Sequence, residues 1–406
     1  RMLTRPRVLA FILAGGKGER LFPLTRDRSK PAVPFGGKYR IVDFVLSNFV
    51  NSGIYSLYVL VQYKAQSLID HLRHAWRIGG VLPDQFIIVV PPQMRRGEVW
   101  YQGTADAVYQ NLNLLRDFHP DIVAIFGADH IYRMDVGEMV AFHLDQKADV
   151  TVAALPVPIG QASGFGIVEA AAGGRITDFQ EKPARPAPMP GDPARSLSSM
   201  GNYLFRREVL VEALLDDAQR NTDHDFGRTI IPDLVPRLGA YAYPFAEADI
   251  AGLQAYEEAG YWRDVGTIPA YWQANMDLLG AEPRLNLDNP RWPILTAAYP
   301  GPSARVVQSD VNDVMVGEGS QIDRANVRRS VLGRNVHIEP GADIEESLVM
   351  DHTIVQSGAR LRRVIVDRYN IIEAGVAIGF DAAQDARRFT VDPSGIVVLA
   401  RGPTRF

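Results

Sequence analysis

Glycines and basic residues follow the first apolar run of the chain. Residues 8–13 read VLAFIL, Gly15 and Gly16 come shortly after this run, and Arg20 and Lys30 follow them. Glycines let backbone N–H groups approach a phosphate chain closely, and the cations offset its negative charge. The segment therefore predicts a site for a nucleoside triphosphate, held for reaction at a phosphorus atom.

The glycine spacing excludes two common phosphate-binding motifs. A Walker-type Gly-x-x-x-x-Gly-Lys-Ser/Thr run does not occur. Gly16 and Gly18 would begin a dinucleotide fingerprint, Gly-x-Gly-x-x-Gly, but Leu21 stands at the position of the third glycine. The alternative interpretation of the segment is a glycine-rich turn without a ligand.

Two carboxylates occupy positions suited to a divalent metal ion. Asp129 follows the apolar run 122–126, and Asp264 lies in a loop of glycine and aromatic residues, 261–267. Because Mg²⁺ prefers hard oxygen ligands and bridges phosphates, such a pair suits phosphoryl or nucleotidyl transfer. The alternative is that both residues are ordinary turn or N-cap aspartates.

Two further segments carry candidate ligand groups. Gly103 and Thr104 open a predicted helix, where Thr104 could cap the helix and leave backbone N–H groups free for a ligand. Lys182 follows Glu181 at a strand end and could bind a monophosphate as a point charge. The alternatives are a capped helix without a ligand and a surface ion pair.

Composition narrows the class of protein. The chain has 406 residues, which predicts at least two domains, and its formal net charge of −4 argues against a nucleic-acid partner. It has no cysteine, which excludes disulfides and thiolate chemistry, and no apolar run as long as a membrane span. His71 and His74 share a helical spacing, but no third metal ligand accompanies them. We expect a cytoplasmic protein without a membrane partner.

Short apolar runs alternate with helical patterns through residues 1–280. Strands are predicted over 7–13, 56–61, 86–90, 122–126 and 150–155, and helices over 43–52, 65–76, 105–118 and 136–146. Continuous Val/Ile/Leu strands separated by helices predict an α/β fold with a mainly parallel, doubly wound (Rossmann-like) sheet. Ligands bind beyond the carboxyl ends of such strands, where the glycine loop and Asp129 both lie.

The composition and the spacing of apolar residues change after residue 280. A proline-rich stretch over 281–304 predicts a linker. In the last domain, 305–406, a β-branched or other apolar residue recurs about every six positions as far as residue 380. This is the hexapeptide period of a parallel β-helix, whose exposed end suits it to assembly.

The chain also carries an ordered set of motifs that resembles one protein family. They read LAGGKGERL, FGGKYRIVDFVLSN, WYQGTADAVYQN, GADHIYRMD, FQEKP, SSMGNYLF, HDFG and YWRDVGT. The set is similar to the sugar-nucleotide pyrophosphorylases and, within them, to the bacterial glucose-1-phosphate adenylyltransferases. The resemblance implies a nucleotidyltransferase that moves AMP from ATP to α-D-glucose 1-phosphate, giving ADP-glucose and pyrophosphate for glycogen synthesis. It also implies Mg²⁺, a left-handed β-helix used in regulation and oligomerisation, and a homotetramer.

The same resemblance implies roles for individual residues. The nucleotide would be bound by Leu13, Ala14, Gly15, Gly16, Gln93, Gly103 and Thr104. Glucose 1-phosphate would be bound by Tyr101, Gly166, Glu181, Lys182, Ser199, Tyr203, Asp225 and Trp262. The catalytic residues would be Arg20, Lys30, Asp129 and Lys182, and the metal ligands would be Asp129 and Asp264.

Regulation by sugar-phosphate effectors is a further expectation from the resemblance. The basic residues that would bind such effectors are Arg28, Arg40, Arg362 and Arg363. Asp27 and Asp117 stand where some relatives have basic residues, so the sequence does not predict which effector binds.

Three other functions remain open at this point. The chain could be a pyrophosphorylase for UDP-glucose or dTDP-glucose, or a non-catalytic regulatory subunit of the same family. It could also be an acyltransferase of the β-helix type with His337 as the base, although that leaves the first 280 residues without a function.

Overall fold

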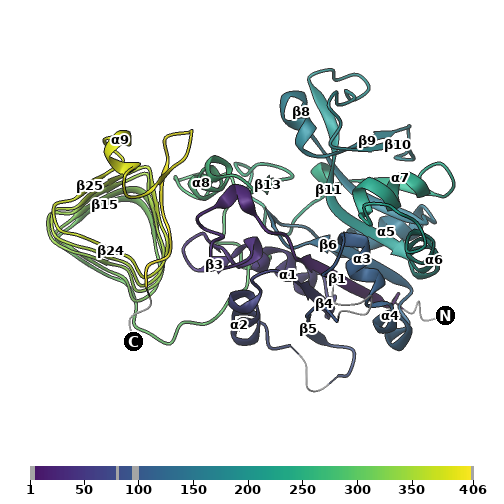
Figure 1. The fold of residues 1–406 in the computed structure, drawn as a ribbon, viewed down its shortest axis with the longest axis horizontal. Coiled ribbons are helices and arrows are strands. Elements are labelled where there is room, and N and C mark those ends of the chain that lie inside the picture. Colours follow the sequence, from purple (N-terminus) through teal and green to yellow (C-terminus); the bar gives the residue numbers. More distant parts are fainter. Residues whose placement is uncertain (1–4, 79–81, 94–99, 404–406) are drawn as a thin grey trace.

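The structure, a computed structural model, describes residues 5–78, 82–93 and 100–403. The chain folds into an α/β body and a β-helix that lies against one side of it (Figure 1). No helix of the described residues has the length and apolar character needed to cross a membrane.

A nine-stranded sheet forms the centre of the α/β body. Its path runs β10-β9-β11-β6-β1-β4-β5, with β8 beside β11 and β12 beside β8. The bounds are β1 Val8–Ala14, β4 Ser56–Val61, β5 Phe86–Val90, β6 Ile122–Gly127, β8 Val150–Pro158, β9 Gly166–Ala170, β10 Ile176–Glu181, β11 Arg195–Arg206 and β12 Ala240–Pro244. The strands β6, β1, β4 and β5 are parallel, and β11 adds antiparallel pairs with β6, β8 and β9.

Helices cover both faces of this sheet, as a doubly wound fold requires. The helices of the body are α1 Ile41–Asn51, α2 Gln66–Ala75, α3 Thr104–Tyr109, α4 Leu112–Phe118, α5 Val136–Asp145, α6 Arg207–Asp217, α7 Ile231–Leu234 and α8 Ile268–Met276. Alternate residues of β1 serve the two faces: Ala10 and Ile12 join the core under α1, α2 and α5, whereas Leu9 and Phe11 join the core under α3, α4 and α6. The predicted fold class is confirmed.

The helix predicted over 105–118 is wrong in one respect, because it is two helices. Gln110 and Asn111 separate α3 from α4. The side-chain amide of Asn111 donates to the carbonyl of Ala107 at 2.8 Å, which is the acceptor that a continuing helix would offer to the backbone N–H of Asn111. The side chain thus replaces the backbone, and that N–H donates to Val108 instead.

Two short strand pairs and three short helical turns complete the part of the body that surrounds the site. The pairs are β2 Pro34–Phe35 with β3 Tyr39–Arg40, and β7 His130–Tyr132 with β13 Trp262–Asp264. The turns are η1 Glu19–Leu21, η2 Lys30–Ala32 and η4 Phe226–Ile230. The pairing of β7 with β13 sets Asp264 opposite His130, so it brings the second predicted carboxylate beside the first.

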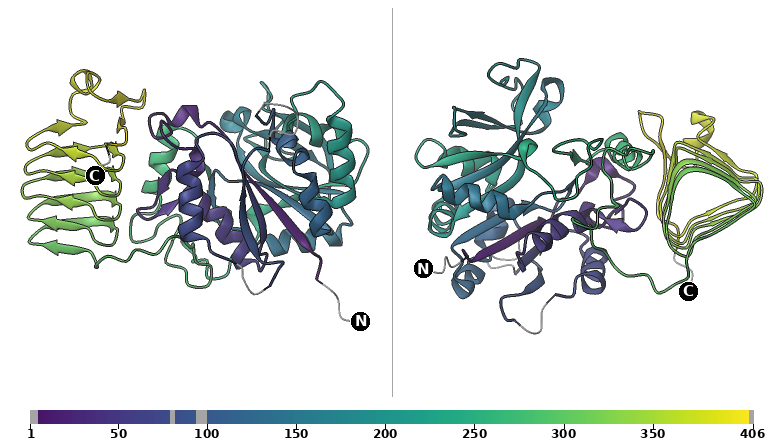
Figure 2. Two further views of the ribbon diagram at one scale, coloured as in Figure 1. Left: turned by 60° about the horizontal axis from the view of Figure 1, so that its bottom comes forward. Right: turned by 180° about the vertical axis from the view of Figure 1, so that it is seen from behind.

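The C-terminal part is a left-handed parallel β-helix of triangular cross-section (Figures 1 and 2). Its strands are β14 Arg305–Val307, β15 Asp310–Val316, β16 Gln321–Asp323, β17 Asn326–Leu332, β18 His337–Ile338, β19 Asp343–Glu345, β20 Leu348–Val349, β21 Ile354–Val355, β22 Arg360–Arg362, β23 Val364–Val366, β24 Ile371–Ile372, β25 Ala377–Ile378, β26 Thr390–Val391 and β27 Val397–Leu399, with α9 at Ala382–Asp385. His337 pairs with Ile354, which pairs with Ile371, so these coils span seventeen residues, one fewer than three hexapeptides. The preceding coil, from Gln321 to His337, spans sixteen.

The two parts share a buried apolar interface. Leu21 and Tyr271 of the α/β body belong to one core cluster with Met350 and Ile365 of the β-helix. Trp272 of α8 adds a hydrogen bond from its indole N–H to the Glu346 carbonyl at 2.9 Å. Burial of this many apolar side chains holds the β-helix against the glycine-loop side of the body.

Candidate active site

A cavity of about 850 Å³ opens at the carboxyl ends of β1 and β6. The structure brings most of the predicted substrate residues together there, although they come from distant parts of the chain. The predicted residues that line the cavity are Leu13, Gly15, Gly16, Arg20, Lys30, Tyr101, Gly103, Thr104, Asp129, Gly166, Glu181, Lys182, Ser199, Tyr203, Asp225, Trp262 and Asp264.

Two predicted nucleotide residues do not line this cavity. Ala14 is buried in the core beneath the sheet edge, because the inward alternation of β1 continues to its last residue. Gln93 is exposed and donates from its amide to the Pro91 carbonyl at 2.9 Å. Neither residue is among those that line the cavity, and contact of Ala14 and Gln93 with a nucleotide stays a prediction.

The glycine loop turns back on itself toward Lys30. Gly18 has a φ of 65°, in the left-handed region that favours glycine, and a Cβ added there would lie 3.0 Å from the Lys30 Cβ. The Thr25 hydroxyl donates to the Gly18 carbonyl at 2.8 Å and fixes the turn. A side chain at Gly18 would therefore push Lys30 away from the cavity.

Lys30 lies between the two predicted metal carboxylates. Its ammonium donates to Asp264 Oδ1 at 2.9 Å and to Asp129 Oδ2 at 3.1 Å. The Lys30 side chain is 7% exposed, whereas that of Asp129 is 40% exposed and opens toward the cavity. The cation thus contacts both carboxylates from within the protein, and Asp129 keeps an accessible side.

Electrostatics keep all three groups charged at neutral pH. Burial alone would lower the pKa of Lys30, but the two carboxylates outweigh burial and raise it above its ordinary value. Burial alone would raise the pKa of Asp129 and of Asp264, but Lys30 and then His130 outweigh it and lower both. The site therefore presents two ionised carboxylates beside one fixed ammonium.

Gly266 is a residue of this cluster that the sequence analysis did not single out. A Cβ on Gly266 would lie 2.9 Å from Asp264 Oδ1, 3.0 Å from Arg20 Nη2 and 3.4 Å from Lys30 Nζ. The missing side chain lets two cations and a carboxylate converge on one stretch of backbone. The glycine in the segment YWRDVGT is the signal that could have identified it.

The described residues contain no group of three or more histidines or carboxylates arranged for a metal ion. Asp129 and Asp264 offer two oxygen donors, and Mg²⁺ is commonly held by one or two carboxylates together with substrate phosphates. The donor set fits Mg²⁺ in that sense. His71 is not a metal ligand here, because its Nε2 lies 2.6 Å from the buried Asp43 carboxylate, and His74 Nδ1 lies 2.7 Å from the Asp70 carbonyl.

The lining of the same cavity also includes Glu181, Lys182, Ser199 and Tyr203. Burial raises the pKa of Glu181, and Asp225 raises it further against the opposing effect of Lys182. The Lys182 side chain is 55% exposed, and its backbone has a left-handed φ of 47° while its N–H donates to the Phe165 carbonyl at 3.0 Å. The Lys182 ammonium, 4.0 Å from Glu181 Oε1, and the partly buried Glu181 carboxylate both line the cavity.

The prediction that the N–H groups of the helix after Gly103 are free for a ligand is wrong. The backbone N–H groups of Ala105 and Asp106 donate to the carbonyl of His224, at 2.8 and 3.3 Å. Thr104 does not cap the helix either, because its hydroxyl donates to Asp225 Oδ2 at 2.9 Å and accepts from the Phe226 N–H. A backbone carbonyl from a loop 120 residues further along the chain therefore accepts the hydrogen bonds that a ligand would have accepted.

The four predicted regulatory arginines lie in different surroundings. Arg28 Nη2 donates to Asp367 Oδ2 of the β-helix at 2.8 Å, and the two side chains are 2% and 1% exposed. Arg362 lies 3.9 Å from Glu345, and the Arg363 guanidinium lies 5.1 Å from the Trp272 ring. The structure therefore does not gather all four arginines around one ligand.

Arg368 joins Arg28 and Arg40 at the domain junction, and the sequence analysis missed it. Burial, followed by the neighbouring Arg40 and Arg28, lowers the pKa of Arg368 to about 9. The Nε atoms of Arg28 and Arg368 are buried and have no hydrogen-bond partner among the described residues. Only the contact between the domains could have revealed this grouping, because Arg28 and Arg368 are far apart in the sequence.

Comparisons with known proteins agree with this architecture. A family model described as "Nucleotidyl transferase" matches residues 9–280, and one described as "GlmU-like, C-terminal hexapeptide" matches residues 302–399. The glucose-1-phosphate adenylyltransferase of Thermodesulfovibrio yellowstonii is 52% identical, over 98% of this chain and 96% of its own. That of Anaeromyxobacter dehalogenans is 50% identical, over 98% of each chain. Glucose-1-phosphate adenylyltransferase 1 of Vibrio vulnificus is 47% identical, over 97% and 98%.

The chain belongs to the glucose-1-phosphate adenylyltransferase family. It is a nucleotidyltransferase whose α/β domain carries the cavity and whose C-terminal part is a hexapeptide β-helix. The expected family is thereby confirmed, and a β-helix acyltransferase based on His337 is not supported.

Proposed function

We propose that this chain catalyses the transfer of AMP from ATP to α-D-glucose 1-phosphate, giving ADP-glucose and pyrophosphate. One observation carries the proposal: Arg20 and Lys30 meet Asp129 and Asp264 in a cavity whose lining also includes a further cation, Lys182. A triphosphate needs cations such as Arg20 and Lys30, and a sugar monophosphate needs a separate cation. The relatives, named for the same reaction, support the assignment.

The proposed reaction needs no covalent enzyme intermediate. A phosphate oxygen of glucose 1-phosphate attacks the α-phosphorus of ATP in line, a new P–O bond forms, and the bond to pyrophosphate breaks. Lys182 binds the attacking phosphate and orients it. Arg20 and Lys30 stabilise the negative charge that develops on the leaving pyrophosphate, because fixed charges cost no reorganisation during the reaction.

We include Mg²⁺ in the proposal as the cofactor, held by Asp129 and Asp264. When bound, the ion neutralises charge on the phosphates that are being transferred and released. The two carboxylates stay ionised because Lys30 lowers the pKa of both. Lys30 thus keeps the ligand oxygens ready for a cation while it contributes a fixed charge of its own.

Polar side chains of the cavity lining would bind the glucose moiety through hydrogen bonds. Glu181 is a partly buried carboxylate that could accept hydrogen bonds from sugar hydroxyl groups, and Tyr203 and Ser199 belong to the same lining. Trp262 supplies an apolar face to the same space. We assign the glucose moiety to this group of residues.

We also propose that the enzyme is a homotetramer in glycogen synthesis and is regulated by sugar-phosphate effectors. Arg28, Arg40 and Arg368 at the domain junction support an anion-binding role, since three guanidinium groups gather there near two carboxylates, Asp367 and Asp351. An effector phosphate there would compensate the excess positive charge.

A pyrophosphate-release assay tests the proposal. ATP, UTP, dTTP and GTP are each supplied with glucose 1-phosphate and Mg²⁺, with and without a panel of phosphorylated metabolites. We expect turnover with ATP in preference to the other nucleotides. Preference for UTP or dTTP would favour the other pyrophosphorylases, and nucleotide binding without turnover under every condition would favour a regulatory subunit.

A further inference from the structure

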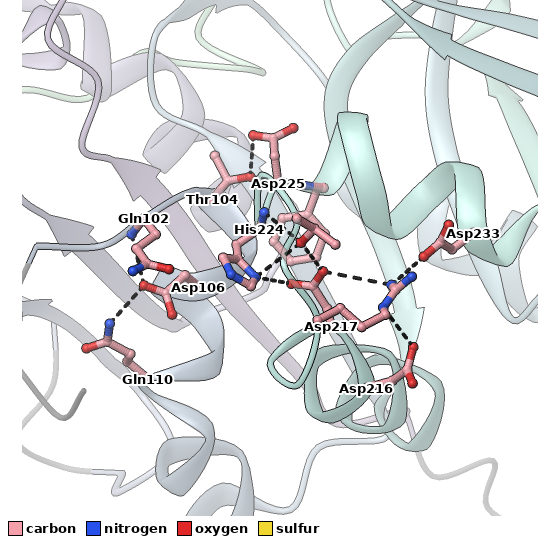
Figure 3. Close-up of polar contacts among 12 residues, drawn as sticks. Gln102, Thr104, Asp106, Gln110, Asp216, Asp217, His224, Asp225 and Asp233 are labelled. Carbon is pink, nitrogen blue, oxygen red and sulfur yellow. Dashed lines mark hydrogen bonds and ion pairs between the residues drawn. The ribbon is translucent and has the colours of Figure 1, made fainter.

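A buried carboxylate–imidazole pair, Asp217 and His224, lies next to the cavity residue Asp225 (Figure 3). His224 Nδ1 lies 2.7 Å from Asp217 Oδ2 at the end of α6, and the side chains are 9% and 3% exposed. The hydroxyl of Thr222 donates to the other Asp217 oxygen at 2.6 Å and accepts from the His224 backbone N–H at 3.1 Å. Neither Asp217 nor His224 lines the cavity.

This pair holds the backbone of residue 224 in an unusual conformation. His224 has a left-handed φ of 50°, which costs energy for a residue with a Cβ and persists where surrounding contacts enforce it. In that conformation its carbonyl accepts from the first N–H groups of α3, Ala105 and Asp106. A Cβ on Gly103 would lie 2.3 Å from the same carbonyl oxygen, so the two segments fit only with glycine there.

The residue after His224 is a cavity residue. Asp225 Oδ1 accepts from the N–H groups of Gly227 and Arg228 at the start of η4, at 2.9 and 3.0 Å, and Oδ2 accepts from Thr104. A Cβ on Gly227 would lie 2.6 Å from Glu181 Oε2. The backbone around His224 therefore sets the positions of three cavity residues, Thr104, Asp225 and Gly227.

We propose that Asp217 and His224 are positioning residues for the cavity residues that would bind the sugar phosphate. The imidazole, held by Asp217, stabilises the left-handed turn at residue 224. This turn places the His224 carbonyl at the first N–H groups of α3 and the Asp225 carboxylate at the Thr104 hydroxyl. Neither residue touches a substrate. The identity of the substrate in this inference rests on the proposed function. The structural coupling between residues 217–225 and α3 does not depend on that function.

Initial-rate kinetics of the full chain test the proposal. His224→Ala is expected to raise the KM for glucose 1-phosphate about tenfold or more, because a hydrogen bond to a charged group is lost. The KM for ATP should rise by a clearly smaller factor, because only Gly103 and Thr104 among the expected nucleotide residues lie beside this turn. His224→Asn is expected to restore most of the loss, because its amide can donate to Asp217 and asparagine tolerates a left-handed φ. Asp217→Asn should shift the KM in the same direction as His224→Ala.

His119→Ala is a matched control. His119 is exposed, ends α4 with a left-handed φ of 53°, and does not line the cavity. The substitution removes a histidine from the same backbone conformation, and both KM values are expected to stay unchanged. If His224→Ala leaves the KM for glucose 1-phosphate unchanged, or raises both KM values equally, the positioning role is wrong.

Hydrogen exchange of the amides in α3 provides a readout that needs no activity. In His224→Ala the amides of Ala105 and Asp106 should exchange faster than in the parent chain, while those of β1 keep their protection. Equal acceleration in β1 would mean general destabilisation and would overturn the proposal. Should His224→Ala fail to fold, Asp217→Asn carries the same two measurements. If the parent chain forms no ADP-glucose but exchange still rises in α3 alone, the proposed function fails and the positioning role stands.

Discussion

Replacing Lys30 with alanine removes a cation from the centre of the site. Its ammonium is 2.9 Å from one carboxylate and 3.1 Å from the other, on a side chain that is 7% exposed, so water cannot replace it freely. Losing one preorganised charge-stabilising group of this kind costs about a hundredfold to a thousandfold in kcat. The two carboxylates, Asp129 and Asp264, would then repel one another without a counter-ion, and we expect the pKa of at least one to rise.

The assay for Lys30→Ala is pyrophosphate release at saturating ATP and glucose 1-phosphate. Lys17→Ala is the matched control, because Lys17 belongs to the same glycine loop, lies 6.0 Å from the Tyr63 ring and does not line the cavity. We expect the control to keep its turnover and Lys30→Ala to lose it, with folding of both confirmed by thermal melting. Turnover of a folded Lys30→Ala protein within about threefold of the parent would refute the charge argument, since a thousandfold loss corresponds to about 4 kcal/mol.

Three further predictions address the metal site, the sugar phosphate and acid stability. Asp129→Asn should lower turnover roughly a thousandfold or more and weaken Mn²⁺ binding measured by EPR; near-normal turnover would contradict a metal role. Lys182→Ala should raise the KM for glucose 1-phosphate about tenfold or more with little change for ATP, and an effect confined to ATP would count against this role. Burial lowers the pKa of His143 from 6.5 to about 4, so the unfolded chain binds the proton first as the pH falls, and stability is lost from pH 6.5 down to about 4. Between about pH 7 and pH 5, the free energy of unfolding of His143→Gln, measured in urea, should therefore fall by about 2 kcal/mol less than that of the parent chain. Equal losses would be evidence against a buried neutral imidazole.

Local pattern accounts for most of the elements of this protein. The strands at 56–61 and 86–90 lie at the predicted bounds, because a short run of β-branched and aliphatic residues between turn signals is interpretable within a few positions. The helix over 105–118 was predicted as continuous because the helical spacing of its apolar residues continues across the break. The break depends on a side chain, Asn111, that competes with the backbone for one carbonyl, and spacing does not register such competition.

The sequence by itself determined which chemical groups this protein has for phosphate chemistry: the glycine loop, Arg20 and Lys30 behind it, and a carboxylate after the fourth predicted strand. The tertiary structure decided that Lys30 contacts Asp129 and Asp264, which are 99 and 234 positions away, and that the His224 carbonyl occupies the start of α3. It also decided that Arg28 is buried against Asp367, 339 positions away, instead of lying open to solvent. The physical reason is that residue type and spacing fix local conformation, whereas the partner of a buried charge depends on which distant segments packing brings beside it.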